Sequence, residues 1–428
     1  MVPVIFYTIG CRSNQAETRV LENLVTEKSG LNVTESLAEA RIAVINTCTV
    51  TGRADRDARK LVARIVRTNP KTRVALIGCQ AEIQKEKLTQ WPGVQWVIGN
   101  ARKMNLDEIL TKTLDDEPRV IAPPIDAGRF TYKTFGTSRR HTRANLKIQD
   151  GCDSFCSYCI VPYARGRARS RVFRDIIKAG RGLAQAGHQE IVLTGINIGN
   201  YNDHGKNLID VIVALEKIPA LRRIRISSIE PQSIPDGLFD LMARSRKLCR
   251  HLHIPIQHGC DEILKSMKRQ TSIEQFFALA RGAERRVNGI CLGTDIIVGF
   301  PGETEDHFTT MYRNLKKTPT HYFHVFSYSA RPMTASYHFP RPVSPDVMAR
   351  RSARLRRLSQ QKRRAYYKTF CGSVQDVLFE QKKGAWWKGL TDNFIHVRLR
   401  SGHALGNRLV NVRLTRIEKT EAIGVAAE

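Results

Sequence analysis

The chain has 428 residues, enough for two or three domains, and its 42% hydrophobic and 25% charged residues are ordinary for a globular protein. No apolar run is long enough to span a bilayer, and the short apolar N-terminus lacks a basic leader and a small-residue cleavage site, so we expect a cytoplasmic protein and not a membrane-spanning or secreted one. Lysine and arginine number 69 against 40 acidic residues, which gives a net charge of +29. This excess indicates a polyanionic partner, and RNA is the leading candidate. The alternatives are a protein that is basic because its whole proteome is basic, and a partner membrane with an anionic surface.

The first hundred residues alternate between short apolar runs and helical patterns. Apolar runs lie at residues 4–9, 42–45 and 74–77, and helical patterns follow the first two at residues 17–27 and 56–67. Strands that alternate with helices form parallel sheets. We therefore expect a parallel α/β domain over residues 1–115, followed by a proline-containing connector over residues 116–137.

The same alternation resumes in the middle of the chain. Helical patterns such as 173–186, 208–216 and 274–286 separate six candidate strands. These strands are expected at residues 146–148, 190–194, 223–227, 252–256, 294–298 and 323–328. Six such units predict a partial (β/α)6 barrel over residues 138–365, with a site formed by the loops at the C-terminal ends of its strands.

The last part of the chain has a different pattern. Residues 349–367 are strongly basic and helical in pattern, and short β-like runs follow at residues 373–379, 394–399 and 409–417. Turns that contain glycine separate these runs. The pattern predicts a small all-β barrel over residues 366–428, of the kind that binds nucleic acid.

The most specific motif comes directly after the first strand of the predicted barrel. Cys152, Cys156 and Cys159 form a C-x3-C-x2-C run, and three thiolates on so short a loop can converge on one iron–sulfur cluster. A 4Fe–4S cluster held by three cysteines keeps one iron open for a cofactor, and the reduced cluster can donate an electron into a bound sulfonium. Structural zinc is the alternative, but zinc prefers four ligands, and the motif offers three.

A second set of three cysteines is spread over the N-terminal domain. Ten cysteines in a chain without an export signal argue against a disulfide framework. Cys11, Cys48 and Cys79 each lie at or just past the end of a predicted strand, and in a parallel sheet these ends share one edge. The three thiols could therefore hold a second cluster, the alternative being three small buried residues. The other four cysteines share no such pattern and are predicted to be packing residues: Cys249, Cys260, Cys291 and Cys371.

With these motifs the chain resembles the radical S-adenosylmethionine (SAM) methylthiotransferases, and most closely the bacterial branch that modifies threonylcarbamoyladenosine next to the anticodon of tRNA. The resemblance covers nearly the whole chain. It departs from the family pattern at Ser13, Ala16 and His258 and over residues 79–82. None of these departures removes a cluster ligand, so they bear on substrate recognition and not on the type of reaction. The matching segments are residues 8–11, 46–51, 78–79, 146–166, 193–195, 227–231, 251–257 and 299–304.

The resemblance implies an enzyme that transfers a methylthio group to carbon 2 of the adenine, with two 4Fe–4S clusters and SAM as cofactors. The central cysteines would hold the cluster that generates a deoxyadenosyl radical from SAM, and the N-terminal cysteines an auxiliary cluster that supplies the sulfur. The central domain would be a barrel of the radical SAM type, and the last domain a TRAM-like RNA-binding barrel. The implied partners are the tRNA anticodon loop and a reducing electron donor, no membrane partner is expected, and the enzyme is expected to be a monomer.

Five residues near the ends of barrel strands are candidates for binding SAM. The loop after the second barrel strand contacts the cofactor's amino group in this superfamily, and here it contains Gly195 and Asn197. Glu230, Gln257 and Asp295 follow or end other strands and could reach the ribose or the methionine part. The alternative for each of the five is an ordinary hydrogen-bonded loop residue.

Basic side chains crowd the helical stretch before the β module, with almost no acidic partner in the run. Such a face could contact phosphates without reading sequence, and the target adenosine would be flipped towards the barrel mouth. Trp386, Trp387 and Phe394 could stack on bases or form the core of the module, and the core is slightly favoured. The basic residues are Arg350, Arg351, Arg354, Arg356, Arg357, Lys362, Arg363 and Arg364.

Two kinds of alternative stay open. Sibling enzymes with the same chemistry modify isopentenyladenosine in tRNA or an aspartate of a ribosomal protein. The net charge of +29 disfavours a basic ribosomal target, and residues 46–51 and 149–151 favour the threonylcarbamoyl branch. A non-catalytic RNA-binding protein with structural zinc would explain the charge, but not two separate sets of three cysteines.

Overall fold

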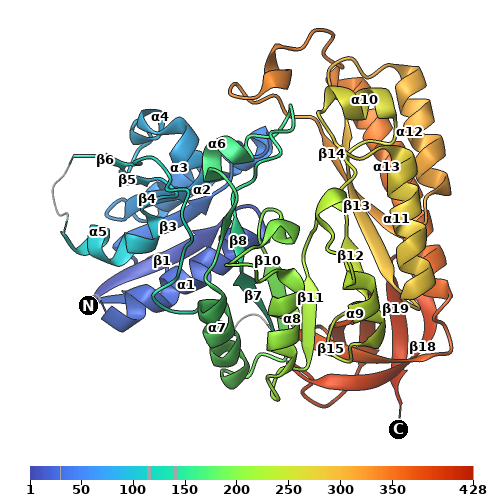
Figure 1. Cartoon of the computed structure of the whole chain (residues 1–428). Coiled ribbons are helices and arrows are strands. Elements are labelled where there is room, and N and C mark those ends of the chain that lie inside the picture. Colours follow the sequence, from blue (N-terminus) through green and yellow to red (C-terminus); the bar gives the residue numbers. More distant parts are fainter. Residues whose placement is uncertain (29, 113–116, 138–141, 428) are drawn as a thin grey trace.

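The computed structural model describes residues 1–28, 30–112, 117–137 and 142–427. It has three parts in chain order, an N-terminal parallel sheet with helices, a central partial barrel and a small C-terminal β-barrel, drawn from blue to red in Figure 1. Within these described ranges, no helix is long and apolar enough to cross a membrane.

The N-terminal sheet has six parallel strands in the order β2-β1-β3-β4-β5-β6. Its central strands are buried along their whole length because helices cover both faces, which explains their continuous apolar runs. The three expected strands are confirmed, and three shorter ones add to them. The strands are β1 (Val2–Thr8), β2 (Leu31–Val33), β3 (Ile42–Thr47), β4 (Arg73–Gly78), β5 (Val94–Ile98) and β6 (Arg119–Ile121).

Helices connect these strands. Thr51 caps α2 by accepting the backbone N–H of Ala54, and the helix ends at Asn69, directly before a proline. The helices of this part are α1 (Arg12–Lys28), α2 (Gly52–Thr68), α3 (Cys79–Gln84), α4 (Glu86–Thr89), the 3-10 turn η1 (Lys103–Asn105) and α5 (Leu106–Lys112). The segment expected to be a connector, residues 116–137, contributes β6 to the sheet. The domain boundaries expected at residues 115–116 and 138 lie outside the described residues.

The six expected barrel strands are all present and parallel. They form two three-stranded sheets, β7-β10-β11 and β12-β13-β14, which are linked because Ile224 of β11 bridges to Leu248 and accepts the N–H of Cys249. The order is that of a partial (β/α)6 barrel. The strands are β7 (Arg143–Lys147), β10 (Glu190–Thr194), β11 (Arg223–Ile226), β12 (His251–His253), β13 (Cys291–Val298) and β14 (Tyr322–Ser327).

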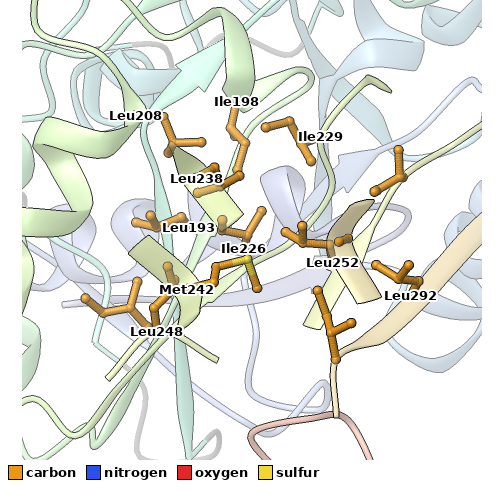
Figure 2. Close-up of a cluster of buried hydrophobic side chains, with 14 of the residues drawn as sticks. Leu193, Ile198, Leu208, Ile226, Ile229, Leu238, Met242, Leu248, Leu252 and Leu292 are labelled. Atoms are coloured by element: carbon orange, nitrogen blue, oxygen red, sulfur yellow. The ribbon is translucent and has the colours of Figure 1, made fainter. Parts of the chain in front are cut away.

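Apolar side chains pack between the strands of this barrel and the helices around it. Figure 2 shows Leu193, Ile226 and Leu252 of three strands gathered with Leu238 and Met242 of a helix, all of them buried. The helices are α7 (Phe173–Gln185), α8 (Leu208–Glu216), α9 (Leu238–Arg244), α10 (Asp261–Ser266), α11 (Ile273–Arg286), α12 (Glu305–Lys317) and α13 (Pro345–Lys368). The boundary expected between residues 365 and 366 falls in the last turn of α13.

The C-terminal part is a closed five-stranded barrel in the order β15-β16-β17-β19-β18, as a TRAM-like module requires. Three of its strands were expected, and β16 and β19 are additions, which carry glycines or charged residues among their apolar positions. The strands are β15 (Val374–Lys383), β16 (Trp386–Thr391), β17 (His396–Arg400), β18 (Leu409–Glu418) and β19 (Glu421–Ala426).

The C-terminal barrel docks on the N-terminal ends of the central strands (Figure 1). Arg225 at the end of β11 is buried, pairs with Glu190 at 2.7 Å and donates to the carbonyl oxygens of Thr391 and Asp392. Arg250 adds an ion pair with Asp392 at 2.7 Å. The C-terminal ends of the strands, at the opposite end of the central barrel, stay available for a site.

The four cysteines outside the two triplets are not all packing residues. Cys249, Cys260 and Cys291 are buried, as expected, whereas Cys371 is exposed. Cys371 lies in the turn between α13 and β15, where the chain runs over the surface, so the prediction for this residue is wrong.

Candidate active site

The central cysteine triplet lies on the loop between β8 (Gln149–Asp150) and α6 (Val161–Arg165). Two backbone hydrogen bonds shape this loop, from the N–H of Cys159 to the carbonyl of Cys156 and from the N–H of Ser157 to the carbonyl of Met267, each at 3.0 Å. All three cysteines line one cavity of about 300 Å³. The loop therefore brings the three thiols to the same space, at the C-terminal end of the barrel.

The cavity has walls from two domains. The cysteine loop and the C-terminal ends of the barrel strands form most of it, the latter including Ser228, Pro255 and Tyr328. Val50 and Thr51 of the N-terminal domain complete it, two and three residues after Cys48. The position agrees with the expectation of a site at the strand ends.

Three of the five candidate SAM residues, Glu230, Gln257 and Asp295, line this cavity. Burial disfavours the charged form of Asp295, but the neighbouring His253, whose Nε2 lies 2.8 Å from its carboxylate, keeps the pKa of Asp295 below its usual value. His258, one of the departures from the family pattern, lies below the Gln257 turn and its Nε2 is 3.2 Å from a carboxylate oxygen of Glu303.

The other two candidates support the loop after β10. Asn197 is buried and donates to the hydroxyl of Ser233 at 2.9 Å. The side-chain oxygen of Gln149 accepts the backbone N–H groups of Ile196 and Asn197, both at 2.9 Å. Ile196, between Gly195 and Asn197, is the residue of this loop that lines the cavity.

Arg269 is a site residue that the sequence did not indicate. Its side chain is 2% exposed, and it donates to Glu230 at 2.5 Å, to the carbonyl of Pro255 at 2.7 Å and to the Cys156 sulfur at 3.7 Å. Burial alone would lower the pKa of Arg269, but Glu230 raises it, so the guanidinium stays charged. Arg269 follows a helix, α10, and not a strand end, so the strand pattern of the sequence does not point to it.

The N-terminal triplet lies at one edge of its sheet. Cys11, Cys48 and Cys79 directly follow or nearly follow β1, β3 and β4, which are neighbours in the sheet. A Cβ atom placed on Gly10, whose φ is +107°, would lie 2.5 Å from Cβ and 3.0 Å from Sγ of Cys48. Only glycine permits this close approach of the two loops.

Buried amides hold the N-terminal thiols in place. Asn14 donates to the carbonyls of Ile9 and Thr47, both at 2.9 Å, and so ties the Cys11 loop to the Cys48 loop. Asn100 lies 3.8 Å from the sulfur of Cys79. Burial, and then the neighbouring Cys79, raise the pKa of Cys48 to about 12, so the three thiols lie close enough to interact.

Both triplets offer thiol donors only. Among the described residues, no group of three His, Cys, Asp or Glu side chains is spaced to hold a single metal ion. A 4Fe–4S cluster places each cysteine on a different iron, so its three ligands stand further apart. Burial raises the pKa of Cys159 to about 12 and that of Cys156 as well, and thiols of this kind ionise when a metal binds them. The donor sets fit iron–sulfur clusters.

A short helix joins the two triplets. α6 begins two residues after Cys159, and its last residue, Arg165, is fully buried between the domains. Arg165 donates to Asn14 of the Cys11 loop at 2.5 Å and to Asp150 at 2.8 Å. Asn100, the neighbour of Cys79, donates to the carbonyl of Ala164 at 2.5 Å. The two sets of thiols are thus held by one connected structure.

The expected RNA-binding residues on α13 fall into two groups. Arg351 is buried and pairs with Glu303 at 2.6 Å and Glu305 at 2.9 Å, and Lys362 and Arg363 are half-buried. Acidic partners for the basic run therefore exist just before and at the start of α12, although the run itself contains almost no acidic residue. The exposed members are Arg350, Arg354, Arg356, Arg357 and Arg364.

The aromatic residues of the C-terminal barrel are packing residues in part. Phe394 stacks on His251 of the central barrel with 4.0 Å between ring centroids. Trp387 packs on the core of the module, and Trp386 carries the guanidinium groups of Arg398 and Arg400 over its ring at 5.1 and 4.7 Å. The core interpretation holds for Phe394 and Trp387.

Comparison with known proteins identifies two family models, the radical SAM superfamily over residues 146–315 and the uncharacterized protein family UPF0004 over residues 3–99. A threonylcarbamoyladenosine tRNA methylthiotransferase MtaB of Bacillus subtilis is 33% identical over 97% of this chain and 94% of its own length. A tRNA-2-methylthio-N(6)-dimethylallyladenosine synthase of Methylobacillus flagellatus is 30% identical over 96% of each chain.

A solved structure shares the fold. The radical SAM methyltransferase TsrM of Kitasatospora setae, which was determined with cobalamin and a 4Fe–4S cluster bound, superposes with a TM-score of 0.58 at 18% identity, over 79% of this chain and 77% of that chain. The likeness at this identity is one of architecture, and it covers most of the chain.

Proposed function

This chain belongs to the radical SAM tRNA methylthiotransferases, and we propose that it transfers a methylthio group to carbon 2 of threonylcarbamoyladenosine next to the tRNA anticodon. The observation that carries the proposal is the pairing of two three-thiol sets through α6, beside a cavity walled by both domains. The B. subtilis relative, whose name states the threonylcarbamoyladenosine substrate, supports the choice of substrate.

The family brings SAM and a 4Fe–4S cluster with it. Cys152, Cys156 and Cys159 would hold that cluster, and we propose a second cluster on the N-terminal triplet. When bound, the first cluster would supply the electron that splits SAM into methionine and a deoxyadenosyl radical, and the second cluster would supply the sulfur atom for transfer. The further partners that we propose are the anticodon loop and a reducing electron donor, and the enzyme would act as a monomer.

The side chains around the cavity orient the cofactor and keep water out. The carboxylates of Glu230 and Asp295 can accept hydrogen bonds from hydroxyl or ammonium groups of SAM. Arg269 holds Glu230 in one orientation and donates to the sulfur of Cys156. The apolar side chains of Ile297 and Phe326 line the cavity and limit the access of water to a site in which a radical must survive.

The substrate is tested with reconstituted enzyme under anaerobic conditions. Anticodon stem–loop RNAs that carry threonylcarbamoyladenosine or isopentenyladenosine are incubated with SAM and a reductant, and the nucleosides are analysed by mass spectrometry. We expect the methylthio product from the threonylcarbamoyl RNA. Product from the isopentenyl RNA alone would contradict the proposal and favour the activity named for the M. flagellatus relative.

The second cluster is tested by iron content. The wild type should hold about eight iron atoms per chain, and either triple Cys→Ala variant about four. Full iron in the variant of Cys11, Cys48 and Cys79 would refute a cluster on that triplet. Zinc without iron in the anaerobically purified protein would instead support a non-catalytic RNA-binding protein.

A further inference from the structure

The cavity reaches the N-terminal domain at the first turn of α2. Thr51 lines the cavity and caps this helix, and Gly52 is its first residue. The backbone N–H of Gly52 donates to the hydroxyl of Ser329 at 3.0 Å, and Ser329 also lines the cavity. The N-terminus of a 17-residue helix is thus docked against the loop after β14, at the cavity wall.

Three polar side chains converge above Gly52. A Cβ atom placed on this glycine would lie 3.6 Å from Nη1 of Arg56, 3.7 Å from Nη2 of Arg331 and 3.7 Å from Oγ of Ser329, and these are the nearest atoms around it. All three can donate hydrogen bonds. The space above Gly52, called the hollow below, is therefore surrounded by donors and has room for about a methyl group, at the edge of the cavity that Thr51 and Ser329 line.

Two hydrogen-bond donors of Arg331 are not used within the described part of the chain. Its side chain is 8% exposed, and its Nη1 pairs with Asp55 at 2.6 Å. Its Nε and Nη2 are buried and have no hydrogen-bond partner within the described part of the chain. A buried donor without a partner is costly, and the turn in which Thr334 donates to the carbonyl of Arg331 keeps the residue in this position.

The charge around the hollow suits one negative group. The guanidinium groups of Arg56 and Arg331 stand against the single carboxylate of Asp55, whose other oxygen accepts the hydroxyl of Thr49 at 3.2 Å. One positive charge is left, and the helix N-terminus adds a partial positive charge. Two forked guanidinium groups match the planar geometry of a carboxylate.

We propose that this hollow, formed by Gly52, Arg56, Ser329 and Arg331, binds the carboxylate of the N6 substituent of the target adenosine. The inference rests on the proposed function, because the threonylcarbamoyl group carries a carboxylate and the isopentenyl group does not. An apolar substituent would leave the donors unpaired, and sites built around hydrogen bonds reject analogues that lack the partner. The hollow thus selects between the two tRNA substrates.

The test compares three anticodon stem–loop RNAs that differ only in the N6 substituent: threonylcarbamoyl, its neutral carboxamide analogue, and isopentenyl. With the reconstituted enzyme, kcat/KM is measured by mass spectrometry and Kd by fluorescence anisotropy. The wild type should prefer the carboxylate over the carboxamide by about tenfold or more. Arg56→Gln and Arg331→Gln should each remove most of this preference and change the values for the carboxamide RNA little.

Two further variants make the test independent of folding. Gly52→Ala places a methyl group in the hollow at ordinary contact distance, so it should reduce the preference in a folded protein. Arg53→Gln is the matched control, because Arg53 lies in the same turn, is 85% exposed and pairs only loosely with Asp57 at 3.8 Å. Arg53→Gln should leave the preference unchanged.

The outcomes separate the two proposals. Equal use of the carboxylate and carboxamide RNAs by the wild type would overturn the carboxylate site and leave the proposed function standing. An equal loss of affinity for all three RNAs in Arg56→Gln and Gly52→Ala would overturn it as well, and would assign the hollow to a backbone phosphate. Methylthio product from the isopentenyl RNA alone would refute the proposed function in the wild type, before any variant is compared.

Discussion

Two buried arginines bring positive charge to the candidate site. Arg269 connects Glu230 to the Cys156 sulfur, and Arg165 connects Asp150 to Asn14 beside Cys11. A buried guanidinium is costly unless it is paired, so both are placed where carboxylates and thiolates supply negative charge. In the sequence they are two of 69 basic residues, and nothing local distinguishes them.

Replacing Arg269 should change the redox behaviour of the neighbouring cluster. Arg269→Gln removes a positive charge and a hydrogen bond at 3.7 Å from the Cys156 sulfur. In the wild type, this charge and this hydrogen bond stabilise the reduced, more negative cluster. We expect the midpoint potential to fall by on the order of 50 mV, measured by a redox titration followed by electron paramagnetic resonance. Lys265→Gln, on the exposed side of α10, is the control. An unchanged potential in a variant with full iron content would contradict this role.

Helices α1 and α6 meet at a buried network of charges between the domains. Glu17 of α1 is fully buried and pairs with Lys103 at 2.6 Å, with Arg165 at 2.9 Å and with Lys147. Burial opposes ionisation of Glu17, but the cations around it, Arg165 foremost, hold its pKa well below the usual value. The network fixes the first helix of the N-terminal domain against the first strand of the barrel.

Neutralising Glu17 should therefore destabilise the protein strongly. Glu17→Gln leaves buried cations without their shared partner, and the loss of one member of a buried ion network costs about 3–5 kcal/mol. Urea denaturation monitored by circular dichroism measures the difference. Asp57→Asn breaks an ion pair with both side chains more than half exposed, which should cost less than about 1 kcal/mol. Similar midpoints for the two variants would contradict the importance of the network.

Helix α13 presents an exposed basic stripe. Arg350, Arg357 and Arg364 are spaced by seven residues and all are exposed, so they lie on one side of the helix. The helix packs on β14, where Ser359 bonds to the backbone of Phe323, and it runs from the level of Glu303 to the C-terminal barrel. It is the surface that we propose for contacts with tRNA phosphates.

A triple substitution on this stripe should weaken RNA binding without changing its selectivity. Arg350→Gln, Arg357→Gln and Arg364→Gln together should lower the slope of log K against log salt by about three, because each phosphate contact contributes roughly one unit. Fluorescence anisotropy over a salt series measures the slope. The matched control substitutes the exposed Arg174, Lys178 and Arg181 of α7. Equal slopes for the two triple variants would show that α13 does not contact the phosphates.

The docking of the C-terminal barrel makes the stability of the molecule depend on pH. His321 and His396 lie at or near this interface, and burial lowers the pKa of each to about 4. Burial also lowers the pKa of His251, on which Phe394 stacks. The unfolded chain binds protons below about pH 6.5, whereas these folded histidines stay neutral down to about pH 4.

The free energy of unfolding should therefore fall as the pH drops from about 6.5 to about 4. Urea midpoints between pH 7.5 and 5 measure this loss. His396→Asn removes one buried titrating group and should make the dependence shallower, whereas His338→Asn, at an exposed position, should not. A dependence that is the same in His396→Asn and the wild type would contradict the assignment.

Much of the fold and the placement of the two cysteine triplets could be predicted from the sequence, because these features repeat or cluster locally. The six barrel strands, the C-x3-C-x2-C loop and the positions of Cys11, Cys48 and Cys79 after strands each depend on a few neighbouring residues. Strands β2, β5, β6, β16 and β19 were missed, and their place in a sheet comes from the strands beside them.

The tertiary structure alone decided which charged residues face a site. Arg351 is buried on two glutamates while its neighbour Arg350 is exposed, although both belong to the same basic run. The pairing of Arg331 with Asp55 joins residues 276 positions apart. Side-chain partners at such distances follow from how the domains pack, and desolvation then determines which charges are paired and which donors are left for a ligand. The sequence by itself determined which thiol donors the protein offers, and the packing of the domains determined what surrounds them.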